Sequence, residues 1–455
     1  MAVNKEITRL ENSNVKLTLT VPRDDVRTQY NDLLKDYSKN IQMPGFRKGK
    51  VPRDVLIRKF GDALKGEALS RIMEASVSEV FQDESLSRED KPLPYSTPQI
   101  QDTPTLDLDA DLSFSMVYDV LPRVTVGSWK ELEVEVPDVS IDDEDITREL
   151  EELRERNAIV FDRDDGDAAR ENDVVTVNYH EIGENGETLP NSERQDFVFT
   201  LGSGYNVYKF DDEIVGMKKG ETREFVKTWP GDESDSVLAG QTKKLSVSLT
   251  ALKEKQLPEL DDDFAQDVDE KYKTLEDLKN SIRERLDKGL ERRLRDVKVS
   301  KLLEKIMENT PVIIPESMIR VEMEGRWRNL ARRFGASIEE TMEIMKKSGK
   351  TAEEIGNEWR PAAEKALHSR LIVETLIEEQ KFEISDEEME KEVETMALES
   401  GTALEEFKKY YEQENMKEYI RDDLKERKLY ELLLAENNIK KGNTTKYLEF
   451  MGNNR

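Results

Sequence analysis

The segment MPGFRKGKVP, residues 43–52, combines side chains that suit binding to RNA or to a protein surface. Residues 41–60 hold six basic residues and one acidic residue, a local balance of +5 (6 − 1), in a chain whose formal net charge is -29. Arginine makes forked contacts to phosphate, lysine adds point charge, and phenylalanine stacks on bases. Composition alone also fits an ordinary solvated turn between two helices. The candidate binding residues are Gly45, Phe46, Arg47, Lys48, Gly49, Lys50 and Pro52.

Few other residues could support covalent or metal chemistry. The chain has no cysteine and only two histidines, His180 and His368, which are far apart in the sequence. Disulfides and thiolate chemistry are therefore excluded, and a zinc site or a histidine-based triad would need unusual ligands. The GSG at residues 202–204 is no nucleotide loop, because no helix with a third glycine follows it. We expect neither a metal nor a cofactor.

Composition predicts several domains with thin cores. A chain of 455 residues is expected to form two to four domains. Its acidic balance argues against general nucleic-acid binding, although screening confines each charge to about 10 Å, so a basic loop can still act locally. The N-terminus has no apolar signal region, and no stretch approaches a membrane span. We therefore expect a soluble, cytoplasmic protein that does not enter a membrane.

Strands and helices are predicted on both sides of the basic loop. Residues 15–21, VKLTLTV, alternate as a half-buried strand, and residues 24–41 show helical spacing. Pro52 is well placed as the first residue of a second helix, which ends near Phe81. A second alternating strand covers residues 114–120. We predict an α+β unit with the basic loop at the tip between its two helices.

The remaining sequence changes periodicity twice. A connector that leads into a helix is followed by short alternating segments punctuated by glycine, which predict a small antiparallel β domain. From residue 255 onward the sequence is helical, with capping boxes that begin at Ser337, Thr351, Ser385 and Thr402. Residues 440–455 are interpreted as a frayed tail. The predicted fold class is multidomain α+β with an all-α C-terminal domain.

The loop GFRKGKVP resembles the ribosome-docking loop of the trigger factor family of bacterial ribosome-associated chaperones. That family's pattern is Gly-Phe-Arg-x-Gly-x-x-Pro, and all five pattern residues are present. The segment QLPELDDDFAQDV, residues 256–268, also resembles the family's junction after its β domain, and the order of parts matches end to end. The resemblance implies a ribosome-binding domain at 1–120, a connector at 121–156, an FKBP-type prolyl isomerase domain at 157–254 and a helical client-binding domain with arms at 255–455.

The resemblance also implies partners. A trigger factor would dock near the ribosomal exit tunnel, on ribosomal protein and RNA, and hold newly synthesised polypeptides open for folding or export. It allows a homodimer when the protein is off the ribosome. Two other hypotheses stay open, a free-standing prolyl isomerase with dispensable flanks and a non-enzymatic helical scaffold. The candidate client-facing residues, each of which also fits a helical core, are Met318, Ile319, Met323, Trp327, Leu330, Met342, Ile344 and Met345.

The segment DFVFTLGSGYNVYKF, residues 196–210, resembles the core of FKBP-type isomerases, which twist a prolyl bond in an aromatic cup. Rotation of the planar bond faces a barrier of about 18–20 kcal/mol. The twisted amide is less polar, so an apolar, water-poor cup favours it. Departures at Asn206, at Tyr208-Lys209 and in the 229–240 loop, which lacks a tyrosine, lead us to expect weak activity. The resemblance implies a cup of Tyr179, Phe197, Phe199, Val207, Phe210 and Leu245, although the alternating phenylalanines also fit an ordinary buried strand.

Overall fold

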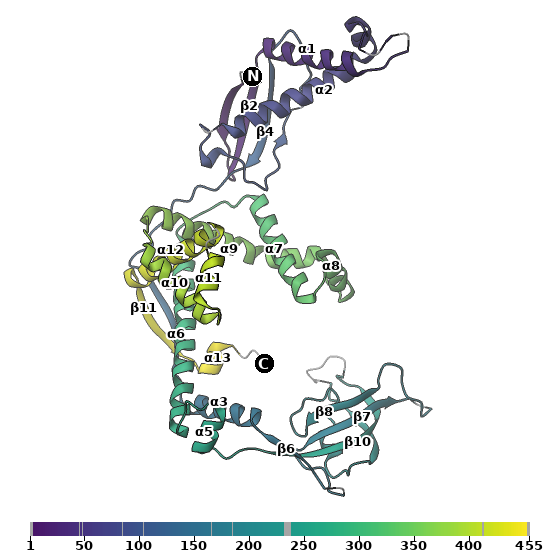
Figure 1. Ribbon diagram of the computed structural model, residues 1–455, viewed down its shortest axis with the longest axis vertical. Helices are drawn as coiled ribbons and strands as arrows, with labels where there is room; N and C mark the ends of the chain where they lie inside the picture. The colour runs from purple at the N-terminus through teal and green to yellow at the C-terminus, as the bar shows by residue number, and fades with distance from the viewer. Residues whose placement is uncertain are drawn as a thin grey trace. The chain divides into compact units, whose positions relative to one another are not determined.

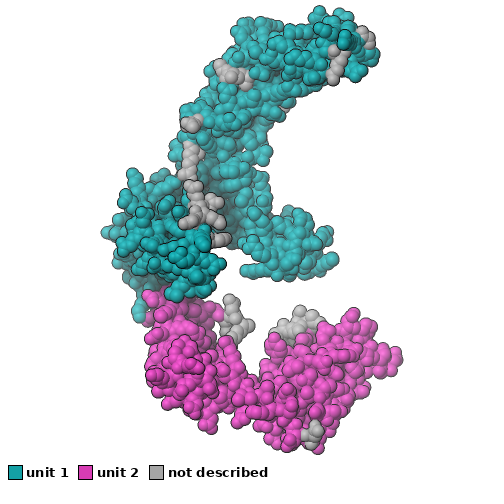
Figure 2. All heavy atoms as spheres, viewed as in Figure 1, with its two compact units in different colours: residues 1–136, 295–442 teal, residues 137–294, 443–455 magenta. Residues whose placement is uncertain are grey.

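The computed structural model describes residues 3–44, 46–47, 49–83, 85–102, 104–164, 166–183, 185–231, 238–411 and 414–452. The chain forms two compact units, coloured separately in Figure 2. The first unit comprises residues 1–136 and 295–442, and the second comprises residues 137–294 and 443–455. In the described part of the chain, no helix combines the length and apolarity needed to cross a membrane.

The N-terminal part of the first unit is a four-stranded antiparallel sheet with two helices alongside it (Figure 1). The strand order is β1-β2-β4-β3, and the core lies between this sheet and the helices. The predicted strands and helices around the basic loop are confirmed. The elements are β1 (Asn4–Arg9), β2 (Asn14–Val21), α1 (Arg23–Asn40), α2 (Arg53–Gln82), the 3-10 helix η1 (Arg88–Asp90), β3 (Gln99–Ile100) and β4 (Leu112–Asp119).

The alternation of apolar and polar residues in β2 predicts which face of this sheet is buried. Every second residue of β2 is fully buried, and each lies opposite a buried residue of β4. A one-residue slip would turn these side chains to solvent, so their burial fixes the register. The opposed pairs are Val15 with Tyr118, Leu17 with Met116, Leu19 with Phe114 and Val21 with Leu112.

The rest of the first unit is mainly helical. Three of the predicted capping boxes are confirmed, at Ser337, Thr351 and Ser385. The fourth, at Thr402, is not confirmed, because its helix begins at Leu404, one residue later than that box requires. The helices are α7 (Glu316–Phe334), α8 (Ile338–Lys347), α9 (Ala352–Gln380), α10 (Asp386–Glu399), α11 (Leu404–Tyr411) and α12 (Glu414–Glu436), and the last part of α6 (Leu275–Glu308) joins them.

The second unit holds a helical part and the β domain. The helices α3 (Asp143–Arg156), α5 (Asp262–Val268), α13 (Tyr447–Met451) and the first part of α6 share one apolar core. The β domain has strand order β6-β10-β7-β8, and β9 pairs with β10. Its elements are β6 (Ile159–Asp162), β7 (Val174–Ile182), β8 (Arg194–Thr200), α4 (Asp211–Ile214), β9 (Thr222–Thr228) and β10 (Thr242–Gln256).

The predicted fold class, multidomain α+β with a β-rich middle and a helical C-terminal region, is confirmed. The prediction of a frayed tail at residues 440–455 is wrong. Residues 438–444 form β11 (Asn438–Thr444), which pairs with β5 (Glu133–Asp138), and α13 buries Tyr447. A strand whose partner lies some three hundred residues away gives no local periodic signal beyond its own short length.

Candidate functional site

The aromatic side chains of the β domain form one connected cluster. Tyr179 on β7 contacts Phe197, Tyr208 and Phe210 edge-on, with ring centroids 5.7, 5.7 and 5.2 Å apart. Phe199 on β8 lies 5.5 Å from Phe197 and 5.9 Å from Phe210. Such ring pairs contribute beyond their buried area and hold one another at defined angles. The cluster is therefore an ordered apolar core with Phe197 and Tyr208 at its partly buried edge.

The predicted cup residues divide by burial into a floor and a rim. Val207 is 58% exposed and belongs to the loop between β8 and α4. The structure thus gathers five of the six residues into one apolar core and leaves Val207 outside it. The floor residues are Tyr179, Phe199, Phe210 and Leu245, and the half-buried rim residue is Phe197.

Sequence reasoning missed three aromatic members of this cluster. Phe225 on β9 lies 6.3 Å from Phe210, and Trp229 lies 6.0 Å from Tyr208 between ring centroids. Phe225 and Trp229 belong to a run whose alternation predicts a strand, and that alternation was the available signal. In the sequence Tyr208 stands out only as a departure from the FKBP pattern. Among the groups that the structure describes, the buried Trp229 Nε1–H has no hydrogen-bond partner.

Asn206 holds the loop between β8 and α4 in shape through its side-chain hydrogen bonds. Its Oδ1 accepts a hydrogen bond of 2.8 Å from the Phe210 backbone N–H, and its Nδ2 donates to Asp211 Oδ2 at 2.5 Å. Asp211 Oδ1 in turn accepts from the Gly202 backbone N–H at 2.9 Å. A buried asparagine is tolerated because its polar atoms are paired. The asparagine that departs from the FKBP pattern therefore fixes Phe210 in the floor.

A charged pair closes one side of the cluster. The Tyr208 hydroxyl donates to Glu181 Oε1 at 2.6 Å, and Lys243 Nζ lies 2.7 Å from the same oxygen. Burial, followed by the hydrogen bond to Glu181, raises the pKa of Tyr208, so the phenol stays protonated at neutral pH. Burial alone would raise the pKa of Glu181, but the hydrogen bonds from Lys243 and Tyr208 outweigh it and lower that pKa. The carboxylate therefore stays ionised and paired.

This arrangement suits a bond rotation better than a proton transfer. The floor is built of rings and aliphatic side chains, and the nearby carboxylate is engaged by Lys243 and Tyr208. An apolar floor stabilises the less polar twisted amide relative to the planar one. Among the described residues, no group of three potential metal ligands occurs.

The basic loop is anchored at both ends and exposed between them. Met43 and Val51 are buried in the core of the sheet and helices, whereas Phe46 is 38% exposed and Arg47 is exposed. The Lys50 backbone N–H donates to the Arg47 carbonyl at 2.9 Å. Two buried anchors and a turn hydrogen bond limit the entropy that docking would cost.

The other predicted loop residues fit this turn. Gly49 has φ +79, a conformation that favours glycine, and Pro52 directly precedes the first residue of α2. Gly45 and Lys48 lie outside the described residues. The aromatic and basic side chains of the described part of the loop therefore face solvent on a fixed turn.

The client-facing candidates on the helices need correction. Met318, Ile319 and Trp327 on α7 are buried and pack inside the first unit, so they present no free apolar face. The helical spacing that selected them is equally the spacing of a core-facing stripe. Ile344 on α8 is exposed. The half-buried members are Met323, Leu330, Met342 and Met345.

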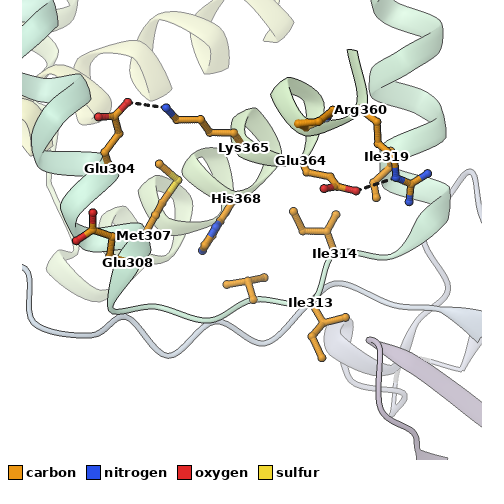
Figure 3. A pocket seen from close by; sticks show the side chains of 12 residues that line it. Glu304, Met307, Glu308, Ile313, Ile314, Ile319, Arg360, Glu364, Lys365 and His368 are labelled. Carbon is orange, nitrogen blue, oxygen red and sulfur yellow. Dashed lines mark hydrogen bonds and ion pairs between the residues drawn. The ribbon is translucent and has the colours of Figure 1, made fainter. Parts of the chain in front are cut away.

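A groove of about 860 Å³ lies between α6, α9 and the start of α7 (Figure 3). Its apolar lining includes Met307 and Ile313, and Ile313 is exposed. Charged side chains from α6 and α9 border it, with Lys365 Nζ 2.5 Å from Glu304 Oε1. His368 Nε2 donates to the Thr310 carbonyl at 2.7 Å. Apolar side chains bordered by paired charges suit a polypeptide segment better than a compact polar ligand.

Comparisons with known proteins agree over nearly the whole chain. The sequence matches the family models for bacterial trigger factor protein at residues 2–153, for the trigger factor C-terminus at 274–435 and for FKBP-type peptidyl-prolyl cis-trans isomerase at 166–231. The trigger factor of Treponema denticola is 42% identical over 99% of this chain and 100% of its own length. That of Borreliella burgdorferi is 32% identical over 99% of each.

The fold agrees as well. A solved trigger factor chaperone structure covers 95% of this chain and 99% of its own, with a TM-score of 0.51 and 22% identity, which is a likeness of fold. The sequence matches span the basic loop, the aromatic cluster and most of the C-terminal helices. This chain therefore belongs to the trigger factor family of chaperones, whose members bind the ribosome and nascent chains, and it carries an FKBP-type peptidyl-prolyl isomerase domain.

Proposed function

We propose that this protein docks on the ribosome near the exit tunnel through the tip between α1 and α2. The observation that carries the proposal is the exposed Phe46–Arg47 pair on a turn whose ends are buried, in an otherwise acidic chain. Arginine and lysine would contact RNA phosphate, and Phe46 would enter an apolar crevice of ribosomal protein. The proposed contact residues are Gly45, Phe46, Arg47, Lys48, Gly49, Lys50 and Pro52.

We assign one role to each successive segment of the chain. Residues 1–120 bind the ribosome, 121–156 connect, 157–254 isomerise prolyl bonds, and 255–455 hold unfolded clients. The proposed isomerase cup comprises Tyr179, Phe197, Phe199, Val207, Phe210 and Leu245. The shared core supports five of these residues, and Val207 is the exposed sixth. We further propose that the protein works in the cytoplasm and forms a homodimer when it is off the ribosome.

Cosedimentation with bacterial 70S ribosomes tests the docking proposal. The variant Phe46→Ala/Arg47→Ala/Lys48→Ala removes two cations and one exposed ring, so its affinity should fall by at least about tenfold. The control Leu10→Ala/Lys16→Ala/Lys65→Ala removes the same charge and one exposed apolar side chain elsewhere in the same domain, and it should bind like the wild type. Equal binding by both variants would remove the loop from the docking surface.

A further inference from the structure

We propose that the side chain of Tyr208 is a lid on the proposed proline cup: its ring covers the floor in the present conformation and turns away when a substrate binds. The proposal rests on the assignment of the isomerase site to that cup, and it adds the step by which a substrate enters. The ligand is a prolyl bond in an unfolded polypeptide, whose proline takes the place of the Tyr208 ring.

The floor of the cup is covered in this conformation. Phe210 and Leu245 are fully buried, and Phe199 and Tyr179 expose only 4% and 6% of their surface. An apolar floor stabilises a twisted amide only where the amide is in contact with it. A substrate proline therefore reaches the floor only after a covering side chain has moved.

Tyr208 is the covering side chain that a loop carries. Among the described residues, the partly buried apolar side chains packed against this core are Phe197, Tyr208 and Phe225. Phe197 lies on β8 and Phe225 on β9, so strand pairing fixes their backbones. Tyr208 lies between β8 and α4, and its ring centroid is 6.5 Å from that of Phe210 and 5.7 Å from that of Tyr179. Of the three side chains, Tyr208 is the one that can leave without disturbing the sheet.

The backbone beside Tyr208 is held by hydrogen bonds that do not involve its ring. The Lys209 backbone N–H donates to the Asn206 carbonyl at 3.0 Å, and Asn206 Oδ1 accepts from the Phe210 backbone N–H at 2.8 Å. Lys227 Nζ donates to the Lys209 carbonyl. These bonds fix the direction in which the Tyr208 side chain leaves the backbone, and the ring turns about that bond. Opening is therefore a side-chain rotation that leaves Phe210 in the floor.

One hydrogen bond holds the ring in the closed position. The Tyr208 hydroxyl donates to Glu181 Oε1 at 2.6 Å, and Lys243 Nζ lies 2.7 Å from the same oxygen. A hydrogen bond to an ionised carboxylate is stronger than one between neutral groups. Glu181 keeps Lys243 as its partner when the Tyr208 ring leaves, so opening breaks this bond without stranding a charge. The closed state is thus favoured, and a bound proline can still replace the ring.

The test measures kcat/KM of the full-length protein on a short peptide in which alanine precedes the proline. Tyr208→Ala removes the lid and should raise kcat/KM about fivefold or more, because apparent affinity rises with the fraction of molecules whose site is open. Tyr208→Phe keeps the ring but loses the bond to Glu181, and it should raise kcat/KM about twofold or more.

The peptide Kd gives a second measurement of the same opening. It is followed by the 19F resonance of fluorotryptophan at Trp229, whose ring centroid lies 6.0 Å from that of Tyr208. The apparent Kd should fall in each variant by the factor by which kcat/KM rises. A rise in kcat/KM with an unchanged Kd would contradict a lid, since a lid acts on access to the cup.

Tyr205→Ala is the matched control, since this tyrosine lies in the same loop and is 79% exposed. It should leave kcat/KM and Kd unchanged. A gain in activity cannot come from a loss of folded protein, so misfolding does not imitate the expected result. If neither Tyr208→Ala nor Tyr208→Phe raises kcat/KM, the ring belongs to the core or to the binding surface and the proposal is overturned. An equal rise in Tyr205→Ala overturns it as well.

Phe197→Ala separates the lid from the proposed cup. Phe197 is the half-buried rim residue, so loss of its ring should lower kcat/KM in the wild type and in Tyr208→Ala alike if the cup is the isomerase site. If Phe197→Ala and Tyr208→Ala both leave kcat/KM unchanged, the cup itself is misplaced. If Phe197→Ala lowers kcat/KM and Tyr208→Ala does not raise it, the cup stands and Tyr208 is no lid.

Discussion

At the residue scale, the polar side chains around the cup explain its geometry. Asn206 and Asp211 pair the backbone groups of a loop that contains Lys209 at φ +49, a conformation uncommon outside glycine. These hydrogen bonds fix where Phe210 and Tyr208 point. Alternation predicted a strand that carries Phe197 and Phe199, but a loop residue is placed by side-chain hydrogen bonds of this kind. Tyr208 was therefore beyond the reach of periodicity, whereas the alternation of residues 223–229 was the available signal for Trp229.

Asn206→Leu tests this account. Leucine would leave the Phe210 backbone N–H and one Asp211 oxygen without their present partner in a buried loop. The β domain should lose about 1–3 kcal/mol of unfolding free energy. Urea unfolding followed by the 19F resonance of fluorotryptophan at Trp229 reports on this domain alone.

Gln195→Leu is the control, because it makes a similar amide-to-leucine change at an exposed position of β8 whose side chain contacts Glu193. Its unfolding free energy should stay within about 0.5 kcal/mol of the wild type. Equal stability of the Asn206 and Gln195 variants would mean that the buried hydrogen bonds do not hold the loop.

At the element scale, sequence patterns predicted the strands, helices and caps that depend on contacts between residues close in the sequence. The alternation of β2 and β4, the spacing of α1 and α2 and three capping boxes all concern neighbours within a few residues. The pairing of β11 with β5 and the burial of Met318 and Trp327 depend on partners far along the chain. An apolar stripe indicates that one face of a helix is buried, but it does not indicate which residues pack against that face.

The capping box of α8 offers a test at this scale. Ser337 Oγ accepts from the Glu340 backbone N–H at 3.2 Å, and Glu340 Oε2 accepts from the Ser337 backbone N–H at 2.8 Å. Ser337→Ala should weaken the start of the helix by about 0.5–2 kcal/mol. Hydrogen exchange of the first α8 amides should then speed up roughly 2- to 30-fold. Ser348→Ala, at the other end of α8, removes one exposed hydrogen bond to the Ile344 carbonyl and should leave these amides unchanged.

The same box has a defined pH response. Hydrogen bonds from the Ser337 backbone and then its side chain lower the pKa of Glu340. A carboxyl whose folded pKa is lowered contributes stability above its unfolded pKa and loses it as pH falls through the lowered value. The protection of the first α8 amides in the wild type should therefore be full at neutral pH and fall in acid. Protection that stays constant as the pH falls through the lowered pKa would contradict the carboxylate half of the box.

At the scale of the whole molecule, charge and cores are segregated along the chain. The chain carries -29 overall, yet residues 41–60 carry +5 (6 − 1), so the proposed contact with RNA phosphate falls on a locally basic segment. Among the described residues, those that form the core of the β domain all lie between Ala169 and Leu252. A part with its own core can fold by itself. We therefore expect prolyl isomerisation and client holding to be separable activities.

Residues 157–256, which include every strand of the β domain, allow that separation to be measured. On short proline peptides the fragment and the full chain should have equal kcat/KM, because both present the same cup. On an unfolded protein whose refolding is limited by a prolyl bond, the full chain should accelerate refolding at least about tenfold more, because the helical regions raise the effective concentration of the bound client near the cup. The measurement compares the refolding rates of the client with the fragment and with the full chain at equal molar concentration. Equal acceleration by fragment and full chain would show that the helices add nothing to isomerisation, and the free-standing isomerase hypothesis would then describe the enzyme better.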